Sequence, residues 1–168
     1  MYFTTINSPL GVLTLTASQG GLTGVYFEEH RHFKGLEGGQ RAPDFRLFDR
    51  VATQLGQFFD GTRQTFDVPL DLSAGTAFQQ QVWRALQTIP YGETCSYGEL
   101  ARHLNNPQAV RAVGAANGRN PLSIIIPCHR VIAANGALTG YAGGLKNKQY
   151  LLKFEAEQHH FFCLPLRH

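Results

Sequence analysis

Segments in which apolar and polar residues alternate occur only before residues 71–75 of this chain, and this division limits the folds open to it. Before that point apolar and polar residues alternate in three short segments separated by the turn sequences SPLG and QGG, namely residues 2–6, 11–17 and 21–27. Alternation with a period of two is typical of strands, and short turns between them indicate an antiparallel sheet. Residues 30–43 are polar and glycine-rich and are expected to form a loop, whereas residues 46–59 carry apolar residues at helical spacing.

After residue 75 the spacing becomes helical. Thr76 and Gln79 form a capping box, and an apolar stripe with the period of a helix follows it at Phe78, Val82, Leu86 and Ile89. A second capping box, SYGE at residues 96–99, is expected to open a short helix that ends near residue 104. The turn sequence Asn-Asn-Pro comes next, with Pro107 expected at the first position of a third helix. Two short helices joined by a tight turn form a helix-turn-helix pattern.

These patterns predict an α+β protein with two domains. The first, residues 1–74, would hold a three-stranded antiparallel sheet, one helix and an extended linker from about residue 64. The second, residues 75–168, would be mostly helical and would contain the helix-turn-helix. With 43% hydrophobic and 16% charged residues, the chain can bury a core and is not of the disordered class.

Composition also limits location and partners. No apolar run approaches the ~20 residues that a membrane helix needs, so no membrane partner is expected. The N-terminus lacks the basic segment of a signal peptide. The three cysteines are too few and too scattered for a disulfide framework, which favours a reducing, cytoplasmic location: Cys95, Cys128 and Cys163.

Charge is unevenly distributed along the chain. Residues 101–154 contain seven Lys and Arg and no Asp or Glu, so the other residues hold eight basic and twelve acidic side chains. A solvated basic face is one interpretation. The other is a surface that binds a polyanion, because Lys and Arg displace counterions from phosphates.

The expected third helix, PQAVRAVGAANGRN, is unusual because most of its side chains are small. Close packing in a core would explain this composition. Alternatively, small residues such as Ala112, Gly114 and Ala115 would let the helix approach DNA closely, with Arg111 as the one long side chain projecting from it. A helix that reads bases should carry Asn, Gln or Arg at several outward positions, so this one favours binding without sequence preference.

Cys128 lies in the sequence SIIIPCHRVI, directly before His129 and Arg130. The thiolate is the nucleophilic form of cysteine, and a nearby base or cation increases its fraction. Because neighbouring side chains of an extended segment point to opposite sides, His129 needs a turn after Pro127, or a bridging water, to act on the thiol. The imidazole would in turn need a carboxylate, and Glu155 is the nearest acid downstream. An inert buried thiol is the other interpretation.

The sequence TGYAGGL, residues 139–145, follows this segment and precedes an expected helix over about 146–155. It is either a simple connection or the wall of a pocket for a flat ring, lined by Tyr141 and backbone amides. Towards the C-terminus His159, His160, Cys163 and His168 lack the paired spacing of a zinc site, so an ordinary tail and no metal are expected. Cys95 lies outside any motif and is expected to be a bystander.

Three motifs together resemble the O6-alkylguanine-DNA alkyltransferases of the stand-alone bacterial type. PCHRVI at residues 127–132 resembles the active-site signature of that family, and RAVGAANGRNP at 111–121 its recognition helix. YAGGLKNKQYLLKFE at 141–155 resembles its substrate loop and last helix. The resemblance covers about residues 75–155. It implies DNA repair by direct damage reversal: O6-alkylguanine, and as an expected second substrate O4-alkylthymine, is flipped out of the duplex, and its alkyl group is transferred irreversibly to the cysteine.

The resemblance assigns a role to each matching residue. Cys128 would be the acceptor, His129 the base acting through water and Glu155 the group that orients it. Tyr97 would donate a proton toward the guanine ring, and Asn120 would brace the turn before the active-site strand. The expected DNA- and substrate-binding residues are Arg111, as the finger that fills the vacated stack, with Ala112, Gly114, Ala115, Arg130, Val131, Tyr141, Ala142 and Gly143.

The same resemblance implies no cofactor and one transfer per molecule, on double-stranded DNA, by a monomer that could cluster along the duplex. Some relatives carry a hydroxyl residue at the position of Ala142 or a zinc site in the N-terminal half, and this chain lacks both sets of residues. Two other functions are weighed against repair. One is a damage sensor that binds alkylguanine without repairing it, although such proteins replace the cysteine. The other is a Cys-His hydrolase, for which the sequence offers only the Cys-His pair.

Overall fold

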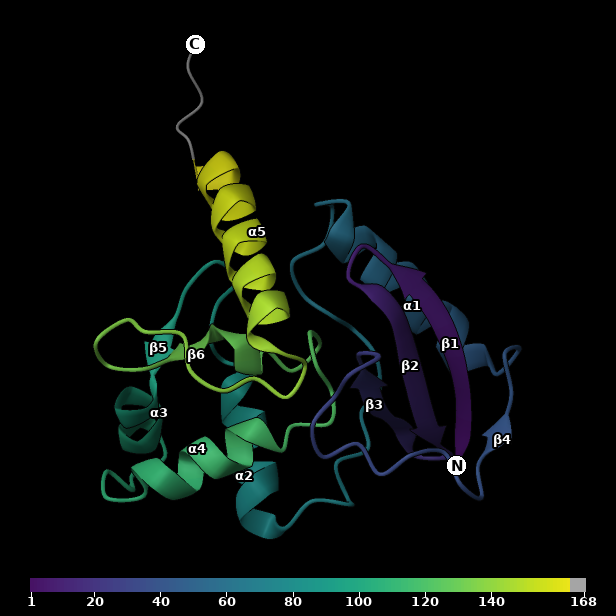
Figure 1. The fold of residues 1–168 in the computed structure, drawn as a ribbon, viewed down its shortest axis with the longest axis horizontal. Coiled ribbons are helices and arrows are strands. Elements are labelled where there is room, and N and C mark those ends of the chain that lie inside the picture. Colours follow the sequence, from purple (N-terminus) through teal and green to yellow (C-terminus); the bar gives the residue numbers. More distant parts are fainter. Residues whose placement is uncertain (164–168) are drawn as a thin grey trace.

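The N-terminal domain is built on an antiparallel meander, as the alternating segments predicted. In the computed structural model, which describes the backbone of residues 1–163 and the side chains of residues 1–158, its first three strands are β1 (Tyr2–Ser8), β2 (Gly11–Ser18) and β3 (Gly21–Tyr26). They pair in the order of the sequence. Helix α1 (Arg46–Phe59) packs on this sheet and buries Phe48, Val51, Leu55 and Phe58 (Figure 1). Among the described residues, no helix is long and apolar enough to cross a membrane.

The prediction of three strands is wrong by one. A two-residue strand, β4 (Gln40–Arg41), pairs in parallel with the start of β1, and the sheet order in the described chain is β3-β2-β1-β4. Backbone groups hold β4, since the Gln40 amide donates to the Met1 carbonyl at 2.8 Å and the Ala42 amide to the Phe3 carbonyl at 2.9 Å. A polar strand in a glycine-rich segment has no apolar alternation, so its sequence pattern is that of a loop.

The expected linker is fixed to the sheet. The Leu22 amide donates to the Pro69 carbonyl and the Asp71 amide donates to the Leu22 carbonyl, both at 2.9 Å. The segment therefore runs beside β3 as an extended chain that is bonded to the N-terminal domain.

The C-terminal domain has the expected helices. They are α2 (Ala77–Leu86), α3 (Tyr97–His103) and α4 (Val110–Gly118). The Thr76–Gln79 capping box is complete. The second box is only half formed, because Ser96 Oγ accepts from the Glu99 amide while the Glu99 carboxylate bonds the Ser96 hydroxyl. Pro107 lies in the turn, and α4 begins three residues later behind Ala109, so its expected place in the helix is wrong.

Two short parallel strands, β5 (Cys95–Ser96) and β6 (Val131–Ile132), join the start of α3 to the segment after the cysteine. Strand β5 was not predicted, and the active-site strand that the resemblance implied is limited to the two residues of β6. Between Pro127 and β6 the residues Cys128–Arg130 form a single 3₁₀ turn, η1.

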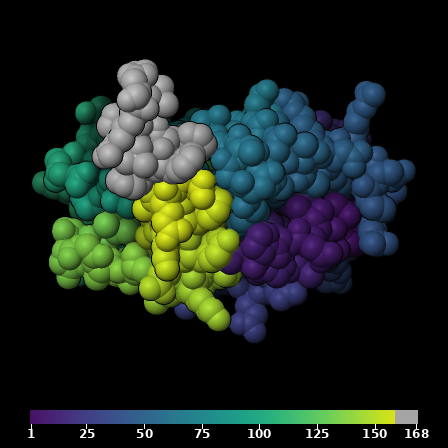
Figure 2. Space-filling view, turned by 90° about the horizontal axis from the view of Figure 1, so that it is seen from above, coloured from purple at the N-terminus to yellow at the C-terminus, as the bar shows by residue number. Residues whose placement is uncertain are grey.

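The last helix, α5 (Leu145–Cys163), is longer than the predicted range. Figure 2 shows it, in yellow, between the purple and blue N-terminal half and the green and teal C-terminal half. Its Phe154 ring lies 5.7 Å from that of Phe58 in α1, between centroids. The helix thus contacts both domains. The expectations for the tail at His159, His160, Cys163 and His168 concern side chains outside the described residues.

Candidate active site

Cys128 sits at the start of η1, at the end of a buried loop that Asn120 braces. The Asn120 side-chain amide donates to the Ile126 carbonyl at 2.8 Å, and its oxygen accepts from the Leu122 amide at 3.0 Å. Within this loop Ile124 has a φ of 74°, a left-handed conformation that is costly for a β-branched residue. The bonds of Asn120 hold that strained loop, which leads directly into the turn carrying the thiol.

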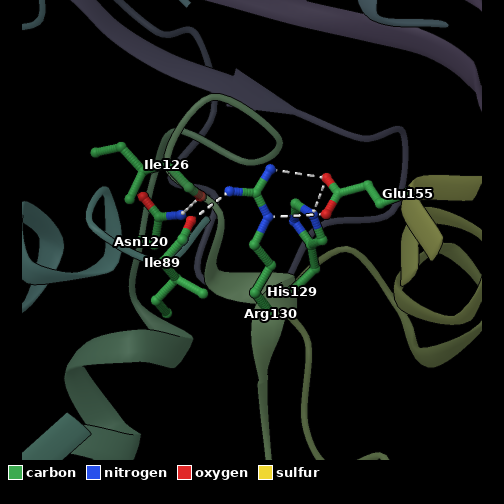
Figure 3. A network of polar contacts seen from close by, with 6 residues as sticks. All are labelled: Ile89, Asn120, Ile126, His129, Arg130 and Glu155. Atoms are coloured by element: carbon green, nitrogen blue, oxygen red, sulfur yellow. Dashed lines mark hydrogen bonds and ion pairs between the residues drawn. The ribbon is translucent and has the colours of Figure 1, made fainter. Parts of the chain in front are cut away.

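His129 and Glu155 form a buried pair between η1 and α5 (Figure 3). The imidazole Nε2 lies 2.7 Å from Glu155 Oε2, and the two side chains are 0% and 1% exposed. Burial alone would raise the pKa of Glu155, but the charge and hydrogen bond of His129, and then those of Arg130, lower this pKa to about 2. An ionised carboxylate can only accept, so Nε2 carries the hydrogen in the neutral ring. Nδ1 then holds a lone pair, and no described side chain bonds it.

Arg130 belongs to the same network, which corrects its expected place among the DNA-binding residues. Its Nε and Nη2 donate to the two Glu155 oxygens at 2.8 and 3.0 Å, and Nη1 donates to the Ile89 carbonyl at 2.7 Å (Figure 3). Its guanidinium carbon lies 5.5 Å from the centre of the Tyr91 ring. Because Arg130 is buried and fully engaged, it orients the carboxylate and is not free to contact a phosphate.

The environment of the Cys128 thiol disfavours its ionised form. Cys128 is 4% exposed. Burial raises the pKa of this thiol to about 11, against the opposing effects of a hydrogen bond from Asn120 and the charge of Lys148. The 3₁₀ turn meets the need for a turn after Pro127. A base is still required to remove the proton at neutral pH.

Lys148 is the residue that sequence reasoning missed. It was counted with the basic face, but it is 0% exposed, and its ammonium donates to the carbonyls of Val131 and Thr139 at 2.7 and 2.8 Å. It ties β6 to the loop over residues 133–144. A lysine in the first turn of an expected helix gives no sign of burial, because its carbonyl partners lie 17 and 9 residues away.

The pocket-loop residues Tyr141, Ala142 and Gly143 pack against the N-terminal domain. The Arg31 amide donates to the Ala142 carbonyl at 2.8 Å, and the Tyr141 ring meets the Phe27 ring edge-on at 6.0 Å. A Cβ added at Gly143 would lie 2.2 Å from the Phe27 ring, so only glycine fits there. Tyr141 is buried, which raises the pKa of its phenol, and no described side chain bonds the hydroxyl.

Helix α4 has a buried and an exposed face, so packing in the core explains only part of its small residues. Val113 and Ala116 face the core, where the Trp83 indole donates to the Ala116 carbonyl at 2.8 Å. Arg111, Ala112 and Ala115 are exposed. At these three positions the exposed face thus carries two small side chains and one long cationic side chain.

Tyr97 lies beside the half-buried Gly114, where an added Cβ would be 3.7 Å from the ring.

Of the seven basic residues in 101–154, five are exposed: Arg102, Arg111, Arg119, Lys146 and Lys153. Among the described residues no group of three His, Cys, Asp or Glu could hold a metal ion.

Comparison with known proteins decides the family. Residues 77–157 match the model of the DNA-binding domain of 6-O-methylguanine DNA methyltransferase, and residues 1–72 match the model of its ribonuclease-like domain. The chain belongs to the 6-O-methylguanine DNA methyltransferase family. It is 50% identical over 153 residues to a methylated-DNA–protein-cysteine methyltransferase of Mycolicibacterium paratuberculosis, covering 91% of each chain. It is 49% identical over 160 residues to one of Methanosarcina acetivorans, covering 92% of this chain and 98% of that one.

Comparison with solved structures identifies the same family as comparison with sequences. A crystal structure of Mycobacterium tuberculosis OGT in complex with DNA superposes with a TM-score of 0.87 at 47% identity, over 94% of each chain. The recognition of the family and of its α+β fold from sequence motifs is therefore confirmed.

Proposed function

We propose that the protein repairs DNA by transferring the alkyl group of O6-alkylguanine to Cys128, once per molecule. The observation that carries the proposal is the contact at 2.7 Å between His129 and Glu155. His129 lies on the turn that begins with Cys128, and Glu155 lies on α5. A buried thiol with a pKa near 11 is useless as a nucleophile unless a base is held beside it. The imidazole would provide that base through a bridging water, because its Nδ1 lone pair has no partner among the described residues, the Cys128 sulfur included.

The proposed reaction moves one proton and one alkyl group. His129 takes the thiol proton, through a water molecule, and the resulting imidazolium is stabilised by the ionised Glu155 that Arg130 holds in place. The sulfur then attacks the alkyl carbon, so that an S–C bond forms as the C–O6 bond breaks. The departing guanine gains a proton, which Tyr97 is placed to donate, and the charge developing on the base is thereby reduced. The thioether is stable, which limits each molecule to one turnover.

Recognition of the base is proposed to follow from the exposed face of α4. Alanines at 112 and 115, with the glycine at 114, would let this helix lie close to the duplex, and Arg111 would fill the space that the flipped base leaves. Flipping costs a few kcal/mol of stacking and pairing, and less for a damaged base. Five exposed cations supply the attraction for phosphates without sequence preference.

One experiment tests this function against the sensor and the hydrolase. The protein is incubated with a duplex carrying labelled O6-methylguanine, and the label is located by peptide mass. We expect one methyl group on Cys128 and repair that stops at one equivalent, with Cys128→Ser binding the duplex but transferring nothing. Binding by the native protein without label transfer would instead identify a sensor, and continued release of product a hydrolase. O4-methylthymine in the same duplex context tests the second substrate.

A further inference from the structure

Tyr97 makes a hydrogen bond that the proposed reaction has not yet used. Its phenol oxygen lies 3.0 Å from Thr139 Oγ1, which joins the first residue of α3 to the loop over residues 133–144. The two residues are 42 positions apart in the sequence. Thr139 is exposed, so water could satisfy its hydroxyl equally well. The direct contact therefore needs both segments to be held in place.

Both ends of this contact are held by buried groups. On the loop side the ammonium of Lys148 binds the Thr139 carbonyl at 2.8 Å and the Val131 carbonyl at 2.7 Å. On the helix side Cys95 in β5 pairs with Val131 in β6, one residue before the Ser96 cap of α3. The backbone of Val131 thus anchors both the threonine and the tyrosine, and it also follows directly on the turn that carries Cys128.

We infer that Thr139 is a positioning residue for Tyr97 in alkyl transfer, an inference that rests on the function proposed above. The Thr139 hydroxyl donates to the phenol oxygen, which leaves the phenol O–H to point at the guanine ring. As Tyr97 gives up its proton to the departing base, negative charge grows on its oxygen, and the bond from Thr139 stabilises that charge. The protons balance without a further reactant: the thiol proton rests on His129, the phenol proton passes to the guanine, and after transfer the imidazolium returns a proton to the Tyr97 phenolate through solvent.

Thr139→Val tests this role, since it removes the hydroxyl and keeps the branched shape. The readout is the single-turnover rate of methyl transfer from O6-methylguanine duplex under excess protein. We expect the rate to fall about 3- to 10-fold, the range of one neutral hydrogen bond. Thr139→Ser should restore most of the rate. Thr94→Val, the same change at an exposed threonine outside this contact, should leave the rate unchanged. A Thr139→Val rate equal to that of the native protein overturns the inference.

A double-mutant cycle with Tyr97→Phe separates positioning from a general loosening of the loop. If Thr139 acts through the phenol oxygen, Thr139→Val adds no further loss once Tyr97 is phenylalanine. A loop that is merely loosened would slow the Tyr97→Phe protein by the same factor as the native one, and that result also overturns the inference. Should the native protein transfer no methyl group at all, the proposed function fails instead, so the two failures are distinguishable.

Discussion

The pKa of Glu155 predicts how much the buried network contributes to the free energy of unfolding, and at which pH that contribution is lost. The pKa of this carboxyl falls from 4.5 to about 2, although burial opposes the change, because His129 and Arg130 hold it ionised. At 1.36 kcal/mol per pKa unit, folding gains about 3 kcal/mol from this group. Since the folded pKa is the lower one, the gain is complete above pH 4.5 and is lost as pH falls toward 2. The stability of the protein should therefore drop across that interval.

The assay is the free energy of unfolding in guanidinium chloride, measured between pH 6 and pH 2 for the native protein and for Glu155→Gln. We expect the native value to fall by about 3 kcal/mol more than the variant value across this range. Near pH 7 the variant itself should be about 3–5 kcal/mol less stable, since the Arg130 guanidinium is left buried without its carboxylate. Parallel pH curves for the two proteins would refute the reasoning, because they would mean that Glu155 has no depressed pKa.

A second variant separates stability from chemistry at this site. Arg130→Met, combined with Glu155→Gln, removes the unpaired charge and should recover part of the lost stability. It should recover none of the lost transfer rate, because the amide oxygen of the introduced glutamine can accept from His129 Nε2 but carries no charge to stabilise the imidazolium. Recovery of both together would mean that Glu155 only supports folding.

Three more variants test other parts of the site. Arg111→Ala should weaken binding to duplex with O6-methylguanine by about tenfold and binding to undamaged duplex much less, measured by fluorescence anisotropy; equal losses would make this residue a simple phosphate contact. Gly143→Ala should cost about 1–3 kcal/mol in guanidinium unfolding and slow transfer, since its Cβ would lie 2.2 Å from the Phe27 ring, and Phe27→Leu should relieve both effects. Lys148→Met should speed hydrogen exchange over residues 133–144 but not in β1 and β2, because it leaves two carbonyls without their donor; unchanged exchange in the loop would contradict the role of the ammonium.

The sequence predicted what local patterns determine. Alternation gave β1 to β3, and the Thr76–Gln79 box marked the start of α2, because both signals lie within a few residues of the element they specify. The choice of Glu155 as the partner of His129 came from two sources, the resemblance and the lack of any nearer acid downstream. The structure then placed the two side chains in contact.

Contacts between distant segments could not be predicted in this way. The pairing of β4 with β1, the bond from Arg31 to Ala142 and the burial of Lys148 all depend on backbone carbonyls of distant segments, which carry no sequence signal. Arg130 was expected among the DNA- and substrate-binding residues, since nothing near it in the sequence indicates a buried acceptor. Its actual partners, Glu155 and the Ile89 carbonyl, lie 25 and 41 residues away. Geometry of this kind depends on how the two domains pack around α5.

Helix α5 makes the geometry of the active site depend on the packing of the N-terminal domain. Phe154 packs on Phe58 of the N-terminal core, and the next residue in the helix is Glu155, which faces the imidazole. A void opened beneath Phe58 would therefore let this turn of helix shift, and the imidazole would lose its alignment although every reacting atom is still present. Mutations that abolish the activity can therefore lie far from the cysteine. Surveys of inactive variants should examine the aromatic residues of α1 as closely as the signature motif.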